Sequence, residues 1–207
     1  MIAVKVKICG ITNVEDALAA IEMGADLIGF NFYPQSKRYV TPDQARAIID
    51  KLPTFVDIAG IFVNAAGEHV RAVAKMCSLN WVQIHGDETP EYCEALRWIS
   101  AKVMKAIRVK DVADIERAND YYTDAILLDA FHPEEYGGTG QKFDWNLVRR
   151  LQTRVFLAGG ITPENAVEAV EVGAYGIDIC SGIESTPGKK DHEKMQKLFD
   201  NIKHVRG

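Results

Sequence analysis

Eight short apolar runs alternate with stretches of helical spacing along the whole of this 207-residue chain. The runs are predicted to be strands that end near Cys9, Phe32, Val63, His85, Arg108, Asp129, Ala158 and Cys180. The helices are predicted over residues 14–23, 42–51, 68–77, 90–99, 112–120, 145–151, 163–172 and 193–204. Strict alternation of strands and helices is typical of a parallel sheet. Open doubly wound sheets more often have five or six strands, so eight favours closure into a (β/α)8 TIM barrel.

The length and composition fit one domain that covers residues 1–207. A chain with 47% apolar residues can build a substantial core, and no segment has the composition of a linker. Barrels of this kind usually have about 250 residues and start near 200, so the loops should be compact.

The stretch 155–191 reads as a strand, a helix and a second strand. Thr162 is the predicted N-cap of that helix, Pro163 its first residue and Gly173 its end. Strands in such a βαβ unit run parallel, so the turns that follow them meet at one end of the sheet.

Both of those turns contain small residues. Gly159 and Gly160 follow the first strand, and Ser181 and Gly182 follow the second. One glycine pair is usually only a turn, but two on neighbouring strands favour a phosphate site, because glycine lets an anion approach backbone N–H groups. Phosphate binds after strands seven and eight in many β/α barrels.

Polar residues alternate with apolar residues in several of the strands. Period-two alternation sends the two sets to opposite faces of the sheet, and the apolar set should pack on the helices. The barrel interior should then receive Lys7, Cys9, Gln83, His85, Asp129 and Asp178. Polar side chains at the ends of barrel strands indicate a site.

Charge, cysteine content and hydropathy exclude several classes of protein. A net charge of −5 argues against nucleic acid. The cysteines Cys9, Cys77, Cys93 and Cys180 form no CxxC pair and no cluster with the histidines, so no metal is expected. The start of the chain lacks a signal-peptide pattern, and no run of 18 apolar residues could span a membrane. We therefore expect a cytoplasmic protein with reduced thiols.

Two residues are candidates for proton transfer. Cys9 could be a base or nucleophile, although a single cysteine is more often a small buried hydrophobe. Asp129 could be a general acid if the barrel mouth keeps it protonated, or it could merely cap the next turn. The strands that end in these residues lie three apart around an eight-strand barrel, so the side chains should face each other.

Other candidates have weaker signals. Arg38, beside Lys37 in the loop after the second strand, could grip a carboxylate bidentately or could be solvated. His85 could serve as acid, base or donor. Asp178 could act in the site or pair with Lys7 lower in the barrel. The glycines within 137–140 suggest a lid or a flexible loop, and Asp144 should cap the following helix.

An ordered set of motifs resembles the phosphoribosylanthranilate isomerase family over essentially the whole chain. They are KICGIT (7–12), SKRYV (36–40), FVN (62–64), VQIHG (82–86), LD (128–129), GGTG with FDW (137–140, 143–145), LAGGIT (157–162), and DICSGIE with PGKKD (178–184, 187–191). Each motif is weak alone, but the ordered set is specific.

The resemblance implies an isomerase of tryptophan biosynthesis that performs the Amadori rearrangement of N-(5′-phosphoribosyl)anthranilate, without a redox cofactor or metal. It implies that Cys9 is the general base and Asp129 the general acid. Arg38 would hold the anthranilate carboxylate. The implied phosphate ligands are Gly159, Gly160, Ser181 and Gly182, and the further candidates for substrate contact are Gln83, His85 and Asp178. Both a monomer and a homodimer are compatible with the resemblance.

Three other functions compete with this one. An isomerase that also takes a substrate of histidine biosynthesis would carry an aspartate in place of Cys9 and a second phosphate site. A ribulose-phosphate epimerase would need metal ligands at the strand ends. A barrel that only binds phosphate would not need both Cys9 and Asp129.

Overall fold

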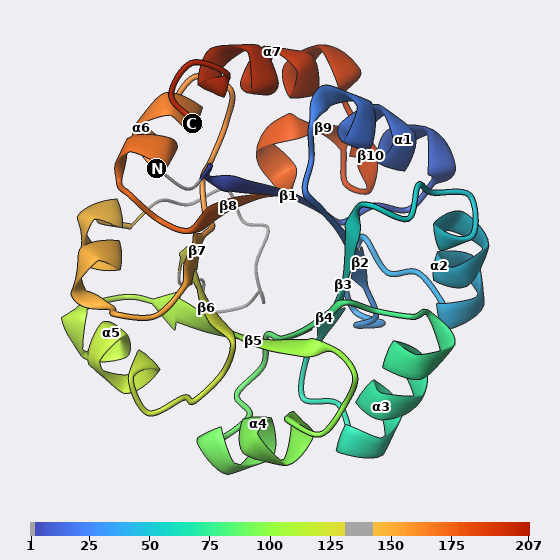
Figure 1. Ribbon diagram of the computed structural model, residues 1–207, viewed down its shortest axis with the longest axis vertical. Coiled ribbons are helices and arrows are strands. Elements are labelled where there is room, and N and C mark those ends of the chain that lie inside the picture. The colour runs from blue at the N-terminus through green and yellow to red at the C-terminus, as the bar shows by residue number, and fades with distance from the viewer. Residues whose placement is uncertain (1–2, 131–142) are drawn as a thin grey trace.

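The centre of the molecule is a closed barrel of eight parallel strands, which confirms the predicted TIM barrel (Figure 1). The computed structural model describes residues 3–130 and 143–207. The strands are β1 (Lys5–Cys9), β2 (Leu27–Asn31), β3 (Asp57–Phe62), β4 (Trp81–Ile84), β5 (Lys102–Val109), β6 (Ala125–Ala130), β7 (Val155–Leu157) and β8 (Gly176–Ile179). Each ends within one residue of the predicted position. Strand β8 pairs with β1 and closes the ring.

Helices surround the barrel and, apart from the start of α6, fall close to the predicted places. They are α1 (Val14–Met23), α2 (Pro42–Ile49), α3 (Gly67–Met76), α4 (Pro90–Leu96), α5 (Val112–Ala118), α6 (Ala166–Glu171) and α7 (His192–Ile202). Between β6 and β7 the predicted helix is a 3₁₀ helix, η1 (Trp145–Arg150), and Asp144 caps it as expected by accepting from the N–H of Asn146. Within the described part of the chain, no helix is long and apolar enough to cross a bilayer.

The predicted start of α6 is wrong by one turn. Thr162 is not its N-cap and Pro163 is not its first residue, since the helix begins at Ala166. The side chain of Asn165 accepts from the Thr162 N–H at 2.8 Å and donates to the Gly160 carbonyl at 2.9 Å. These two bonds hold residues 163–165 as a separate turn, which ties the glycine loop to the start of the helix.

Two apolar layers follow from the alternation in the strands. The larger layer lies between the sheet and the helices and includes Val6, Ile8 and Ile177. The smaller layer fills the barrel itself, where Trp81, Met104 and Phe156 are buried. Because the inward positions nearer the carboxyl ends of the strands are polar, the filled interior forms a floor beneath a polar mouth.

One element was not predicted. A short antiparallel pair, β9 (Glu184–Thr186) and β10 (Lys189–Lys190), follows β8 and a 3₁₀ turn at Ser181–Ile183. It lies beside α1 and α7, outside the ring of strands (Figure 1). The loop at 137–140, interpreted as a lid or flexible loop, lies outside the described residues.

Candidate active site

A pocket opens at the carboxyl ends of the strands and brings all the predicted site residues together. Its lining includes Cys9, Arg38, Gln83, His85, Asp129, Gly159, Gly160, Asp178, Ser181 and Gly182. These residues come from strands β1, β4, β6 and β8 and from the segments that follow β2, β4, β7 and β8. Lys7, the remaining residue of the inward set, lies one layer deeper and is fully buried.

Cys9 has a sulfur neighbour that the sequence reading did not place in the site. Ile8 of β1 pairs with Ile179 of β8, so Cys9 and Cys180 follow at adjacent positions. Their side chains share a hydrogen bond, which lowers the pKa of Cys180 to about 7; burial opposes this shift, while Lys190 and Arg38 support it. The same bond, together with burial, raises the pKa of Cys9. The pair therefore places a thiolate beside Cys9 near neutral pH.

Asp129 lies at the end of β6 with its carboxyl group almost fully buried. One oxygen, Oδ1, accepts from the N–H of Ala130 at 2.8 Å. The other, Oδ2, lies 3.4 Å from Nε2 of His85. A buried carboxyl group fixed on one side and open to the pocket on the other is suited to proton transfer.

Gln83 and His85 form a linked pair on and just after β4. As the amide is placed, Nε2 of Gln83 donates to Nδ1 of His85 at 2.8 Å, so the neutral ring carries its proton on Nε2. Among the described residues, neither Oε1 of Gln83 nor Nε2 of His85 has a hydrogen-bond partner, although both are buried. Buried polar atoms without partners are costly, so these two atoms suit the polar groups of a ligand.

Asp178 forms an ion pair with Lys7, which is the structural alternative that the sequence offers for it. The Nζ of Lys7 lies 2.9 Å from Oδ1 of Asp178, and both side chains are buried. Burial acts against the charge on Lys7, but Asp178 outweighs it and raises the pKa of Lys7. This pair supports the floor of the pocket, and Asp178 also borders the pocket itself.

Arg38 reaches the pocket already bound to a carboxylate, which the sequence reading missed. Its Nε lies 2.9 Å from Oε1 of Glu184, and its Nη2 lies 2.6 Å from Oε2. Lys190, whose side chain is also buried, donates to the same carboxylate at 3.0 Å. Both Glu184 and Lys190 stand in the motifs at 178–184 and 187–191, yet only the hairpin β9–β10 brings them against a loop 146 residues away.

The glycine turns adopt backbone that other residues rarely accept. Gly159 and Gly160 have φ values of +84° and +68°. A Cβ on Gly182 would lie 1.9 Å from the carbonyl oxygen of Ile161, so the turn after β8 packs directly on the turn after β7. The two turns thus form one continuous backbone surface at the pocket.

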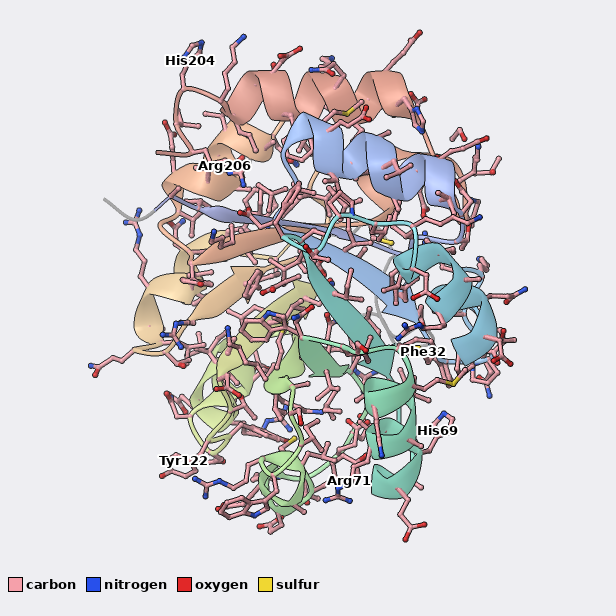
Figure 2. All side chains as sticks on the ribbon, turned by 45° about the vertical axis from the view of Figure 1, so that its right-hand side comes forward. Phe32, His69, Arg71, Tyr122, His204 and Arg206 are labelled. Atoms are coloured by element: carbon pink, nitrogen blue, oxygen red, sulfur yellow. The ribbon has the colours of Figure 1, made fainter. Side chains whose placement is uncertain are left out.

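Metal ligands do not gather in the part of the chain that the structure describes: no group of three His, Cys, Asp or Glu side chains is arranged to bind an ion. Figure 2 shows His69 on α3 and His204 beyond α7, both on the outside of the barrel. In the same view Phe32 lies just after the end of β2. Its ring stacks on that of Phe62, with 5.3 Å between the two ring centroids, and both residues belong to the core.

Fold and site together define a class: a (β/α)8-barrel enzyme that presents a thiol, a carboxyl group and a glycine-lined turn to one small pocket. The particular family follows from comparison with known proteins. The chain belongs to the N-(5′-phosphoribosyl)anthranilate isomerase family, whose model matches residues 6–201.

Relatives of known name or structure agree over nearly the full chain. The N-(5′-phosphoribosyl)anthranilate isomerase of Trichlorobacter lovleyi is 48% identical, over 98% of this chain and 99% of its own length. A solved monomeric form of the dimeric enzyme of Thermotoga maritima is 42% identical, covers 98% of this chain and 100% of its own, and has a TM-score of 0.86. A solved isomerase in complex with reduced 1-(o-carboxyphenylamino)-1-deoxyribulose 5-phosphate is 41% identical, with the same coverage and a TM-score of 0.85.

Proposed function

We propose that this chain catalyses the Amadori rearrangement of N-(5′-phosphoribosyl)anthranilate to 1-(2-carboxyphenylamino)-1-deoxyribulose 5-phosphate in tryptophan biosynthesis. The observation that carries the proposal is the single pocket lined by Cys9, Asp129 and the glycine turns. An isomerisation of this type needs one proton delivered and one removed at neighbouring atoms of a sugar phosphate. Acid–base side chains suffice for it, without a redox cofactor or metal.

In the proposed mechanism Asp129 protonates the ring oxygen of the furanose. The C1′–O bond breaks, the anilino nitrogen supplies the electron pair, and an open-chain Schiff base forms. Cys9, as thiolate, then removes the proton from C2′ and the electron pair moves to the nitrogen, which gives an enolamine. Tautomerisation to the ketone completes the reaction, and the two side chains regain their starting protonation as protons exchange with solvent.

The neighbouring sulfur supports a basic role for Cys9. Near neutral pH the charge rests on Cys180, which accepts the hydrogen bond of the Cys9 thiol. Transfer of that proton to Cys180 would leave the thiolate on Cys9, beside the cation of Lys7. Because the two sulfurs share one proton, this transfer needs no base outside the pair, although Cys9 holds the proton more strongly than Cys180 does.

The ends of the substrate are assigned to different walls of the pocket. Arg38 would bind the anthranilate carboxylate, and Gly159, Gly160, Ser181 and Gly182 would bind the phosphate. The unpartnered Oε1 of Gln83 and Nε2 of His85 would bind sugar hydroxyl groups. Asp178, fixed by Lys7, would contact the substrate at the floor of the pocket.

We also expect residues 1–207 to act as one catalytic domain in the cytoplasm, with a phosphorylated small molecule as the ligand and neither nucleic acid nor a membrane as partner. The chain would be a monomer or a homodimer, and light scattering of the purified protein would distinguish these states.

The direct test is the loss of phosphoribosylanthranilate fluorescence with purified protein, with the next enzyme of the pathway in excess. Turnover by wild type, together with none by Cys9→Ala, supports the proposal and excludes a barrel that only binds phosphate. Absence of turnover by folded wild type contradicts it. Turnover of the related phosphoribosyl substrate of histidine biosynthesis at a similar kcat/KM would favour the dual-substrate alternative.

A further inference from the structure

One buried carboxylate beside the pocket collects an unusual number of donors. Glu184, at the start of β9, is 8% exposed. It accepts from Nε and Nη2 of Arg38, from Nζ of Lys190 at 3.0 Å and from the N–H of Gly188 at 3.2 Å. Burial acts to raise the pKa of Glu184, but the bonds from Arg38 and the charge of Lys190 outweigh it and lower the pKa, so the group is ionised near neutrality.

The contact with Arg38 uses one particular edge of the guanidinium. Glu184 occupies the edge formed by Nε and Nη2. A guanidinium has five N–H groups in a planar fork, so the edge formed by Nη1 and the outer hydrogen of Nη2 is left for a second carboxylate. Among the described residues, the Arg38 guanidinium donates its hydrogen bonds to Glu184, from Nε and Nη2.

The stem of Arg38 is fixed independently. A Cβ on Gly10 would lie 2.6 Å from Cδ of Arg38 and 2.9 Å from Sγ of Cys180. The side chain therefore crosses the bare backbone of Gly10, directly beside the sulfur pair. With the stem packed there and one edge bound by Glu184, the guanidinium plane has little freedom left.

Lys190 contacts Glu184 with its own side chain fully buried. Its Nζ also lies 4.0 Å from Sγ of Cys180, whose thiolate is stabilised by both Lys190 and Arg38. The two cations are thus balanced by Glu184 and Cys180, so what Glu184 provides is the orientation of the guanidinium and not a surplus of positive charge.

We propose that Glu184, with Lys190 as its counter-charge, is a positioning residue that aims the free edge of Arg38 into the pocket and so determines the preference for a carboxylate-bearing substrate. This inference rests on the proposed function and adds to it the residue that would set specificity. The opposite role would give the opposite result. If Glu184 competed with the substrate carboxylate for Arg38, removal of Glu184 would strengthen the binding of that substrate.

Calorimetric titration with two ligands separates these roles. One ligand is reduced 1-(o-carboxyphenylamino)-1-deoxyribulose 5-phosphate, and the other is its counterpart without the ring carboxylate. The proteins are wild type, Glu184→Gln, Glu184→Asp and, as matched control, Glu68→Gln on the exposed face of α3. The ratio of the two Kd values measures the ligand preference. A general loss of stability would weaken the binding of both ligands alike and would leave this ratio unchanged.

We expect wild type and Glu68→Gln to prefer the carboxylate ligand by about tenfold or more, as for a charged hydrogen-bonded pair. Glu184→Gln should lose most of that preference while still binding the ligand without carboxylate, which also shows that it is folded. Glu184→Asp keeps the negative charge on a shorter side chain and should retain part of the preference for the carboxylate ligand. If Glu184→Gln does not fold, the aspartate variant decides by the same ratio.

An undiminished preference in Glu184→Gln or Glu184→Asp would overturn the inference, and so would tighter binding of the carboxylate ligand. A wild type that turns over phosphoribosylanthranilate but binds both ligands equally would overturn it too, while the proposed function would stand. A wild type that neither turns over the substrate nor binds either ligand would instead remove the proposed function.

Discussion

The thiol of Cys9 donates a hydrogen bond to the sulfur of Cys180 across the junction of β1 and β8, where the barrel closes. Two cysteines in such contact share their protons, and the two ionisations belong to the pair more than to either residue. The first proton leaves with a pKa of about 7, assigned to Cys180. The second is held much more strongly, which is seen as the raised pKa of Cys9.

The Cys9–Cys180 pair predicts where kcat/KM falls on the acidic side of its pH profile. The active form lacks one proton, so kcat/KM should fall as the pH decreases through about 7. In Cys180→Ser only one thiol remains, buried and without the second sulfur to share the charge, so the limb should move to higher pH. Stopped assays between pH 5.5 and 9.5 measure the shift. A limb in the same place in both proteins would exclude the pair as the titrating group.

Removal of either proposed proton-transfer group should reduce kcat far more than it changes KM. General acid–base groups contribute about 10²–10⁴-fold each, so Cys9→Ser and Asp129→Asn should each lower kcat by at least about a hundredfold. KM should change little, because neither group is assigned to the phosphate or carboxylate. Steady-state kinetics of folded variants check this. Near-normal kcat in Asp129→Asn would make His85, 3.4 Å from that carboxylate, the next candidate acid.

Phosphate affinity should depend on the backbone at Gly160. Its φ of +68° disfavours any side chain, and Gly160 lines the pocket. Gly160→Ala should raise KM at least several-fold by strain and by obstruction of the anion. Gly173→Ala is the matched control, since φ is +87° there but a Cβ would meet nothing within 4 Å. Equal KM values in the two variants would contradict the phosphate assignment.

The carboxylate of Asp16 predicts part of the acid sensitivity of the fold. This fully buried group accepts from the N–H of Lys190, from Asn13 and from His192, each at 2.8 Å. Burial acts to raise the pKa of Asp16, but these bonds outweigh it and lower the pKa. A carboxyl group whose pKa is lower in the folded than in the unfolded state stabilises the fold. This contribution is complete at pH values above the pKa of the unfolded state, and it is lost as the pH falls through the pKa of the folded state.

Asp16→Asn should therefore reduce the free energy of unfolding near pH 7 by about 1–3 kcal/mol, and by less near pH 3. Urea titrations at the two pH values measure the difference, with Asp43→Asn on the exposed start of α2 as the control. A loss that is the same at both pH values would show that packing of the side chain, and not its charge, holds α1 against β10.

Much of the architecture could be read from the chain because it depends on local regularities. Period-two alternation placed Cys9, Gln83, Asp129 and Asp178 inside the barrel, and the pocket lining contains all four. Apolar residues at helical spacing placed most of the helices: α1, for example, was expected over residues 14–23 and spans Val14–Met23. Such signals act between residues a few positions apart, so one sequence is sufficient to see them.

The contacts that distinguish this site join residues far apart in the chain. Arg38 and Glu184 are 146 positions apart, and Lys7 and Asp178 are 171 apart. The sequence suggested the second pair, because both residues had inward parity on adjacent strands of a closed barrel. It gave no basis for the first, since a loop and an unpredicted hairpin meet only after the barrel has closed.

The sequence by itself determined the barrel, the end of the barrel at which the pocket opens and many of the residues that line it. Tertiary structure alone decided which partners those residues have: Cys180 for Cys9, Glu184 for Arg38, and a turn at 163–165 in place of the first turn of α6. The physical reason is that periodicity fixes the direction of each side chain from its own strand. Hydrogen-bond partners and charge balance depend on how separate strands and loops pack.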